Sequence, residues 1–143
     1  MSLLRTLLTP FTFPLSLVYG SIIWIRNKLY DLGWVPSSAF DIPIISVGNI
    51  TTGGSGKTPL VMYLADLLQQ NGKNPGIASR GYGRKSQGMV IVHDGKDLIT
   101  DVENSGDEPY LMASVLKTVS VVVCEDRQEG ISHLLKNNSS DVI

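Results

Sequence analysis

The segment Thr51-Thr52-Gly53-Gly54-Ser55-Gly56-Lys57-Thr58 constrains the fold more than any other part of this sequence. It lies between an apolar run, Ile42–Val47, which predicts a buried strand, and the run Lys57–Gln70, which predicts a helix. Glycines let a loop turn several backbone N–H groups inward, and the helix that follows directs its positive end to the same place. The segment therefore predicts a phosphate-binding loop that holds a nucleoside triphosphate such as ATP.

Two residues of this loop have distinct expected roles. Lys57 supplies a point charge to the β- and γ-phosphates, and the Thr58 hydroxyl binds Mg²⁺. The usual pattern has glycine at its first position, where this chain has Thr51, and some ATPases carry a lysine where it has Thr52. The alternative interpretation is a glycine-rich turn that happens to contain a lysine.

Strand-like and helix-like segments alternate along most of the chain. This alternation predicts an α/β fold of the P-loop NTPase type, a mostly parallel sheet with flanking helices, preceded by an apolar N-terminal helix. Expected strands are Ile42–Val47, Gly76–Ser79, a hairpin of Met89–His93 with Leu98–Thr100 around the turn Asp94-Gly95, Val119–Cys124 and a strand that starts at Asp141; expected helices are Lys57–Gln70, Asp107–Lys117 and Asp126–Lys136. The continuous apolar run Val119–Cys124 predicts a strand buried on both faces.

Charged segments follow the predicted strands. In open α/β sheets, ligands bind beyond the carboxyl ends of the strands. Arg80 and Arg84 follow the second strand, and Arg127 follows Val119–Cys124. Each arginine is a candidate to neutralise phosphate charge, with a solvated surface position as the alternative. Tyr82, between two glycines, is expected to stack on a base or sugar, or simply to pack.

Gly106-Asp107-Glu108-Pro109 opens a predicted helix and allows two interpretations. Asp107 is a suitable N-cap, and acidic residues stabilise a helix N-terminus. Alternatively, Asp107 accepts the proton of an attacking hydroxyl, which is the role of aspartate in kinases.

The N-terminal segment, residues 1–35, differs from the core that we expect over residues 36–143. It carries no charge between Thr6 and Ile25, and Pro10 and Pro14 are expected to break it. A helix over Leu15–Tyr30 would have an apolar stripe with basic residues at its ends, which is typical of a helix lying in a membrane interface. A core helix, a membrane-spanning helix and a signal peptide are the alternatives.

The remaining composition adds few constraints. The net charge of −1 gives no indication of a nucleic-acid partner. The one cysteine, Cys124, lies in an apolar run and is expected to be buried, and His93 and His133 are interpreted as surface residues. Ser140–Ile143 resembles the opening of a buried strand, so we expect the chain to be an N-terminal fragment.

Several segments together resemble one family, the tetraacyldisaccharide 4′-kinases, which are the lipid A 4′-kinases of Gram-negative bacteria. The resemblance covers the whole chain and rests on the following segments: Ser46-Val47-Gly48-Asn49, Gly53–Pro59, Ser79-Arg80-Gly81-Tyr82, Gly106-Asp107-Glu108-Pro109 and Glu125-Asp126-Arg127. Thr51 is normal in this family.

The resemblance implies ATP- and Mg²⁺-dependent phosphorylation of the 4′-hydroxyl of tetraacyldisaccharide 1-phosphate to lipid IVA. It implies an enzyme on the cytoplasmic face of the inner membrane, a catalytic Asp107, a site neighbourhood of Arg80, Tyr82, Glu108 and Arg127, and an N-terminal helix that contacts membrane and acyl chains. Family members are longer and continue into an Asp-Asp-Gly-x-Gln-His segment, so we expect little or no kinase activity from these 143 residues.

Two other functions stay open at this point. A soluble P-loop NTPase that acts as a switch or delivers metal would need no apolar N-terminus, and would favour a lysine at Thr52 or cysteine and histidine ligands. A membrane-anchored nucleotide-binding protein without catalysis is the third hypothesis.

Overall fold

The computed structural model describes residues 2–48, 56–137 and 140–143, with side chains from Thr12 onward. The predicted loop residues Thr51, Thr52, Gly53, Gly54 and Ser55 therefore lie outside the described residues. The chain divides into two compact units, Met1–Ala39 and Phe40–Ile143, which we describe separately.

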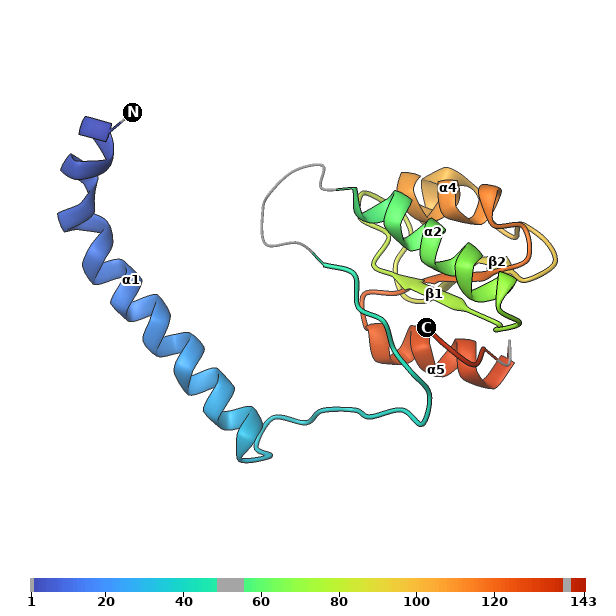
Figure 1. The fold of residues 1–143 in the computed structure, drawn as a ribbon, viewed down its shortest axis with the longest axis horizontal. Coiled ribbons are helices and arrows are strands. Elements are labelled where there is room, and N and C mark those ends of the chain that lie inside the picture. Colours follow the sequence, from blue (N-terminus) through green and yellow to red (C-terminus); the bar gives the residue numbers. More distant parts are fainter. Residues whose placement is uncertain (1, 49–55, 138–139) are drawn as a thin grey trace. The chain divides into compact units, whose positions relative to one another are not determined.

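The first unit consists of one long helix and the turn after it. Helix α1 spans Ser2–Asp31 without a break (Figure 1), so the prediction that Pro10 and Pro14 interrupt it was wrong. Each proline removes one backbone donor, but the remaining hydrogen bonds of a 30-residue helix continue past it. The helix ends at a turn with Gly33 at φ 72°, where the Trp34 N–H donates to the Leu29 carbonyl.

Polar side chains inside α1 bond to the helix itself. The Ser16 hydroxyl donates to the Phe13 carbonyl at 2.7 Å, and the Ser21 hydroxyl to the Leu17 carbonyl at 2.8 Å. Over the described part of the chain, no helix combines the length and the apolar character that crossing a membrane requires.

The second unit is a small α/β fold whose elements lie close to the predicted ranges. In chain order they are α2 (Lys57–Gln70), β1 (Gly76–Ser79), β2 (Val90–Asp94), α3 (Val102–Ser105), α4 (Asp107–Val115), β3 (Ser120–Val123) and α5 (Arg127–Asn137). Helix α3 was not predicted, because four residues carry too little periodicity to be recognised.

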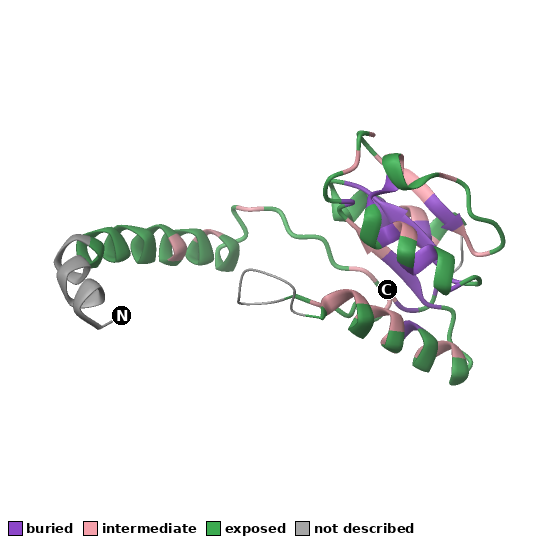
Figure 2. Ribbon diagram, turned by 90° about the horizontal axis from the view of Figure 1, so that it is seen from above, coloured by how far each residue is buried: buried purple, intermediate pink, exposed green. Residues whose placement is uncertain are grey.

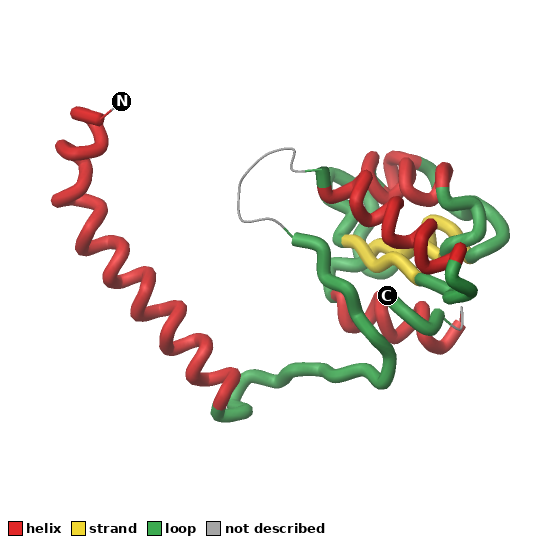
Figure 3. Tube along the Cα trace, in the orientation of Figure 1, coloured by secondary structure: helices red, strands yellow, loops and turns green. Residues whose placement is uncertain are grey.

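The sheet has the strand order β1-β3-β2 and is mixed. Figure 3 shows its strands in yellow among the helices in red. β1 is parallel to β3, with Gly76 opposite Ser120, whereas β2 is antiparallel to β3. The predicted mostly parallel sheet is therefore wrong for β2. The second strand of the predicted hairpin, Leu98–Thr100, does not form; Leu98 makes only an isolated antiparallel bridge with His93.

Two predicted strands appear only as hydrogen-bonded contacts. The Ile45 N–H donates to the Ile143 carbonyl, and the Ile143 N–H donates to the Pro43 carbonyl at 3.1 Å. Val142 forms an isolated parallel bridge with Pro75, just before β1. The segments at Pro43–Ile45 and Val142–Ile143 thus lie beside the β1 edge without forming assigned strands.

Helices cover both faces of the sheet. α2 and α4 lie over one face and α5 over the other (Figure 1). The β3 residues are all buried, as predicted for a strand covered on both faces (Figure 2). Cys124 is buried as expected, but the prediction of a surface His93 was wrong: it is 4 % exposed, and its Nδ1 accepts the Gly95 N–H at 3.0 Å.

The strand directions define two edges of the sheet. The carboxyl edge, where β1 and β3 end, carries the loop Arg80–Gly88, the start of α4 and the start of α5. The amino edge carries the turn Asp94–Asp97 and the residues that lead into β3.

Candidate functional site

A cavity of about 600 Å³ runs along β1, from Pro75 and Ile143 at its amino end to the carboxyl edge of the sheet, where charged side chains line it. Its polar lining comes from four separate stretches of chain that all reach this edge. The polar lining residues include Lys57, Thr58, Ser79, Arg80, Tyr82, Asp107, Glu108 and Arg127. All of these except Ser79 were predicted for the site, so seven predicted residues line one cavity.

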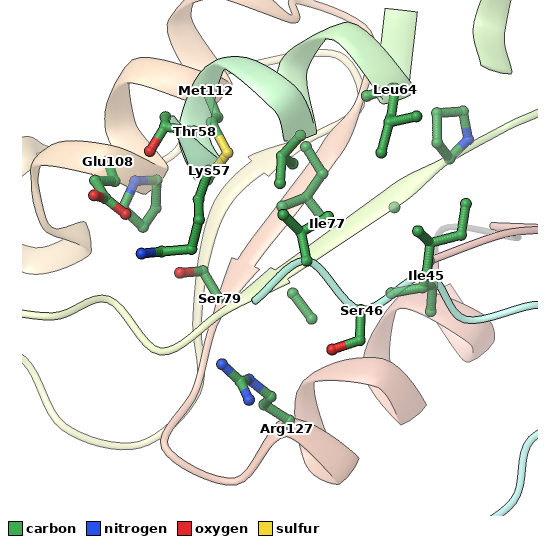
Figure 4. A pocket seen from close by; sticks show the side chains of 18 of the residues that line it. Ile45, Ser46, Lys57, Thr58, Leu64, Ile77, Ser79, Glu108, Met112 and Arg127 are labelled. Carbon is green, nitrogen blue, oxygen red and sulfur yellow. The ribbon is translucent and has the colours of Figure 1, made fainter. Parts of the chain in front are cut away.

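The start of α2 contributes Lys57 and Thr58. Gly56 precedes them at φ 70° and, among the residues that the structure describes, caps the helix without a side-chain hydrogen bond of its own. In Figure 4 the Lys57 side chain extends from α2 toward Ser79, at the end of β1. A lysine at a helix N-terminus suits an anion with several phosphate groups.

The end of β1 contributes Ser79, Arg80 and Tyr82. Arg80 is exposed, and Tyr82 is 99 % exposed, so its ring is available to a ligand rather than packed in the core. Ser79 was not predicted as a site residue. Its position as the last residue of a strand was the signal that could have identified it.

Asp107 and Glu108 form the first turn of α4. Asp107 is the first helical residue and Gly106 is the N-cap, so the interpretation of Asp107 as N-cap was wrong. Gly106 takes a conformation with φ 90° and ψ 156° that is essentially restricted to glycine. The Asp107 residue that follows it is exposed and lines the cavity.

Arg127 is the first residue of α5, and its guanidinium points into the cavity from the opposite face of the sheet (Figure 4). Arg84, the third candidate arginine, does not line the cavity. Its side chain is 3 % exposed and pairs with Glu125 at 2.5 Å. Of the three arginines, only Arg80 and Arg127 are placed to meet a phosphate.

The cavity combines three cationic side chains with two carboxylates. Lys57, Arg80 and Arg127 suit a polyphosphate, while the Thr58 hydroxyl and the carboxylates of Asp107 and Glu108 offer the oxygen ligands that Mg²⁺ prefers. Among the residues that the structure describes, no three His, Cys, Asp or Glu side chains gather as a metal cage. That composition fits an ion held largely by phosphate and water.

Comparisons with known proteins now identify the family. A family model described as tetraacyldisaccharide-1-P 4′-kinase (LpxK) matches residues 8–143. This chain belongs to the LpxK family. The family match favours the kinase over the P-loop switch and metal-delivery alternatives.

Individual relatives agree with the family match. The tetraacyldisaccharide 4′-kinase of Aquifex aeolicus is 49 % identical over 140 residues, covering 98 % of this chain and 42 % of the relative. That of Chlorobaculum parvum is 43 % identical over 123 residues, covering 86 % of this chain and 34 % of the relative. The chain thus spans less than half the length of these relatives.

A solved structure matches the fold as well. A crystal structure of LpxK from Aquifex aeolicus, described as an "apo" form in complex with ATP, superimposes with a TM-score of 0.77 at 49 % identity. The match covers 97 % of this chain and 42 % of that chain.

Proposed function

We propose that this chain carries the ATP-binding part of a tetraacyldisaccharide 4′-kinase, which phosphorylates the 4′-hydroxyl of tetraacyldisaccharide 1-phosphate to give lipid IVA. The observation that carries the proposal is that Lys57, Thr58, Asp107 and Arg127 all line one cavity at the carboxyl edge. The relative from Aquifex aeolicus whose structure is described as a complex with ATP supports the choice of nucleotide.

Each side chain has a distinct role in this proposal. Lys57 and the start of α2 bind the β- and γ-phosphates, together with the loop Thr51–Ser55. Arg80 and Arg127 neutralise the charge that develops on the transferred group, and Tyr82 stacks on the base or sugar. Glu108 lies next to Asp107, in the first turn of α4.

Asp107 is the proposed general base. Its exposed carboxylate at the cavity can accept the proton of the 4′-hydroxyl as that oxygen attacks the γ-phosphorus of ATP, the bond from that phosphorus to the β,γ-bridging oxygen breaks and ADP leaves. Thr58 and one of the carboxylates would hold Mg²⁺, which when bound withdraws charge from the phosphate oxygens.

A chimera tests the transfer step. Residues 1–143 of this chain replace the matching part of the Aquifex aeolicus kinase, with which they share 49 % identity. The chimera is expected to phosphorylate the disaccharide, and Asp107→Asn is expected to lower kcat by about 10²–10⁴-fold, the contribution of general base catalysis, with little change in ATP affinity. The matched control, Asp97→Asn, removes a carboxylate from the amino edge.

An inactive chimera that folds and binds ATP would count against the assigned function. If the chimera is active and its Asp107→Asn and Asp97→Asn variants have the same kcat, the proposed kinase function stands, but Asp107 is not the general base. The sequence-based prediction that the 143 residues alone have little activity is checked by the same assay without the chimeric partner.

We further propose that α1 contacts a membrane surface and the acyl chains of the substrate. Large apolar side chains of α1 are more than half exposed, including Leu15, Tyr19, Ile22 and Trp24. Near its end, the Arg26 guanidinium lies 5.3 Å from the centre of the Tyr30 ring, and a basic and aromatic end of this kind suits a membrane interface.

Flotation with vesicles that contain phosphatidylglycerol tests this role. The chain is expected to float with the vesicles, and Ile22→Asp is expected to release it, because a carboxylate replaces an apolar contact with lipid. Ser21→Asp adds the same charge to the neighbouring position and is expected to float more than Ile22→Asp. A chain that stays unbound, or equal behaviour of the two variants, would contradict the proposal.

A further inference from the structure

The loop Arg80–Gly88 contains two adjacent basic residues in opposite environments. The Arg84 side chain is 3 % exposed, whereas the Lys85 side chain is 73 % exposed in its pair with Glu103. Burying a guanidinium removes it from water and requires several hydrogen bonds in return. A buried arginine side chain in a loop that is mostly exposed therefore points to a specific positional role.

The Arg84 guanidinium joins parts of the loop to the end of β3. Its Nη2 donates to Glu125 Oε1 at 2.5 Å and to the Gly88 carbonyl at 2.6 Å, and its Nη1 donates to Ser86 Oγ at 3.0 Å. The other oxygen of Glu125 accepts the Gly88 N–H at 3.1 Å. The carboxylate thus holds both ends of the Arg84–Gly88 segment.

The same loop is tied to the segment before α4. Ser86 Oγ donates to the Asn104 carbonyl at 2.5 Å, and the Lys85 N–H donates to the Glu103 carbonyl at 2.8 Å. A Cβ on Gly81 would lie 2.6 Å from Arg84 Cδ and 2.7 Å from the Ser105 carbonyl oxygen. The loop backbone, the Arg84 stem and the residues before Asp107 are therefore in close contact.

These contacts connect three stretches that line the cavity. Arg80 and Tyr82 belong to the loop itself, Asp107 follows the Ser105–Gly106 contact, and Arg127 lies two residues after Glu125. Arg84 does not line the cavity. Its hydrogen bonds reach the loop and Glu125 directly, and they reach the segment before α4 only through Ser86, which donates to the Asn104 carbonyl.

We propose that Arg84 and Glu125 form a positioning pair that fixes the Arg80–Tyr82 segment and the start of α4 in the arrangement that binds nucleotide phosphates. This inference rests on the proposed function, since it assigns a role in that same site. The pair acts through Arg80 and Asp107 rather than by touching the ligand.

The pKa of Glu125 agrees with a carboxylate that stays ionised in the folded chain. Its own backbone N–H lowers the pKa most, and the Arg84 guanidinium and the Gly88 N–H lower it further. The pair is therefore charged on both sides at neutral pH.

The test compares Arg84→Ala with Lys85→Ala, which removes the neighbouring exposed ion pair and serves as the matched control. MgATP affinity is measured for the full 143-residue chain, together with amide hydrogen exchange of segments 80–88 and 105–110. Arg84→Ala is expected to weaken MgATP binding by roughly tenfold, the size of one charge-assisted hydrogen bond lost from the phosphates, and to accelerate exchange in these two segments. Lys85→Ala is expected to change neither.

Further variants keep the test decisive if Arg84→Ala unfolds the chain. Arg84→Lys keeps the charge but loses the planar fork, so it is expected to retain the fold and to show part of the same defect. The double variant Arg84→Ala with Glu125→Ala is expected to be no weaker in MgATP binding than the worse single variant, because the two residues act as one unit.

The result that would overturn the inference is an Arg84 variant that binds MgATP as well as Lys85→Ala does. Exchange that rises equally in β1 and β3 would also overturn it, since that indicates general destabilisation. If the unaltered chain fails to bind MgATP, the proposed function fails. The exchange data at 105–110 then still decide whether the pair holds the start of α4.

Discussion

The two edges of the sheet each hold an ionised carboxylate near the end of a strand, but they hold it in different ways. At the amino edge, Asp94 Oδ1 accepts the N–H groups of Lys96 and Asp97, two and three residues away. At the carboxyl edge, Glu125 accepts from Arg84 and Gly88, which lie 41 and 37 residues away.

This difference in sequence separation has a functional consequence. At the amino edge, the hydrogen bonds that hold the Asp94–Asp97 turn are made between residues two or three positions apart. The carboxyl edge is assembled from distant stretches, and its surplus of cationic side chains lines a cavity. Only the second arrangement brings together groups that can bind a polyphosphate.

The largest expected effect comes from removing the lysine at the start of α2. Lys57→Ala is expected to weaken ATP binding by about 10- to 100-fold, because charge-assisted hydrogen bonds contribute ~1.5–3 kcal/mol. Lys96→Ala, at the amino edge, is expected to leave the affinity unchanged. Isothermal titration with MgATP measures both affinities. Equal affinities for the two variants would contradict the claim that ATP binds at the carboxyl edge and not at the amino edge.

A pair of glycines with similar backbone conformations sharpens the comparison. Gly106 has φ 90° and Gly95 has φ 96°, so alanine at either position is expected to cost about 1–3 kcal/mol of stability, measured by urea unfolding. A Cβ on Gly106 would lie 3.0 Å from the Tyr82 carbonyl oxygen, whereas one on Gly95 would meet the Ser120 hydroxyl. Gly106→Ala alone is therefore expected to weaken ATP binding as well.

That comparison fails if Gly95→Ala weakens ATP binding as much as Gly106→Ala does at equal loss of stability. It also fails if neither variant loses stability.

The smallest expected effect is the acid dependence of stability. The pKa of Asp94 is lowered from 3.8, first by the Asp97 N–H and then by the Lys96 N–H, and the pKa of Glu125 is lowered from 4.5. A lowered folded-state pKa stabilises the fold above the unfolded-state value, and this contribution is lost as the pH falls through the folded-state value.

Asp94→Asn and Glu125→Gln are therefore each expected to be less stable than the unaltered chain at pH 7. The Glu125→Gln difference is expected to shrink as the pH falls below about 4.5, and the Asp94→Asn difference as it falls below about 3.8, the ordinary pKa values of these side chains. Thermal unfolding between pH 7 and pH 3 measures them. A difference that grows on acidification would contradict the direction of these pKa shifts.

Features that depend on neighbouring residues could be predicted from the sequence. α2 has the predicted bounds because its apolar spacing ends at Asn71-Gly72, and Gly72 takes φ 73° as a helix end requires. The Asp94-Gly95 turn and the buried β3 run were identified for the same reason. Each carries its signal within a few residues.

Features that depend on distant partners could not be predicted. The direction of β2 is set by its antiparallel pairing with β3, in which Val90 lies opposite Val123, 33 residues further along the chain. Arg84 was grouped with Arg80 and Arg127 because nothing local indicates a partner at Glu125. His93 was assigned to the surface because its turn is polar, although the sheet buries it.

A chemical-shift map of the ¹⁵N-labelled chain titrated with MgATP tests the central claim most directly. We predict shifts in the amides of Lys57, Thr58, Arg80–Tyr82, Gly106–Glu108 and Arg127, with the Asp94–Asp97 amides unchanged. Shifts concentrated at Asp94–Asp97, or no shift at the carboxyl edge at saturating MgATP, would contradict the account.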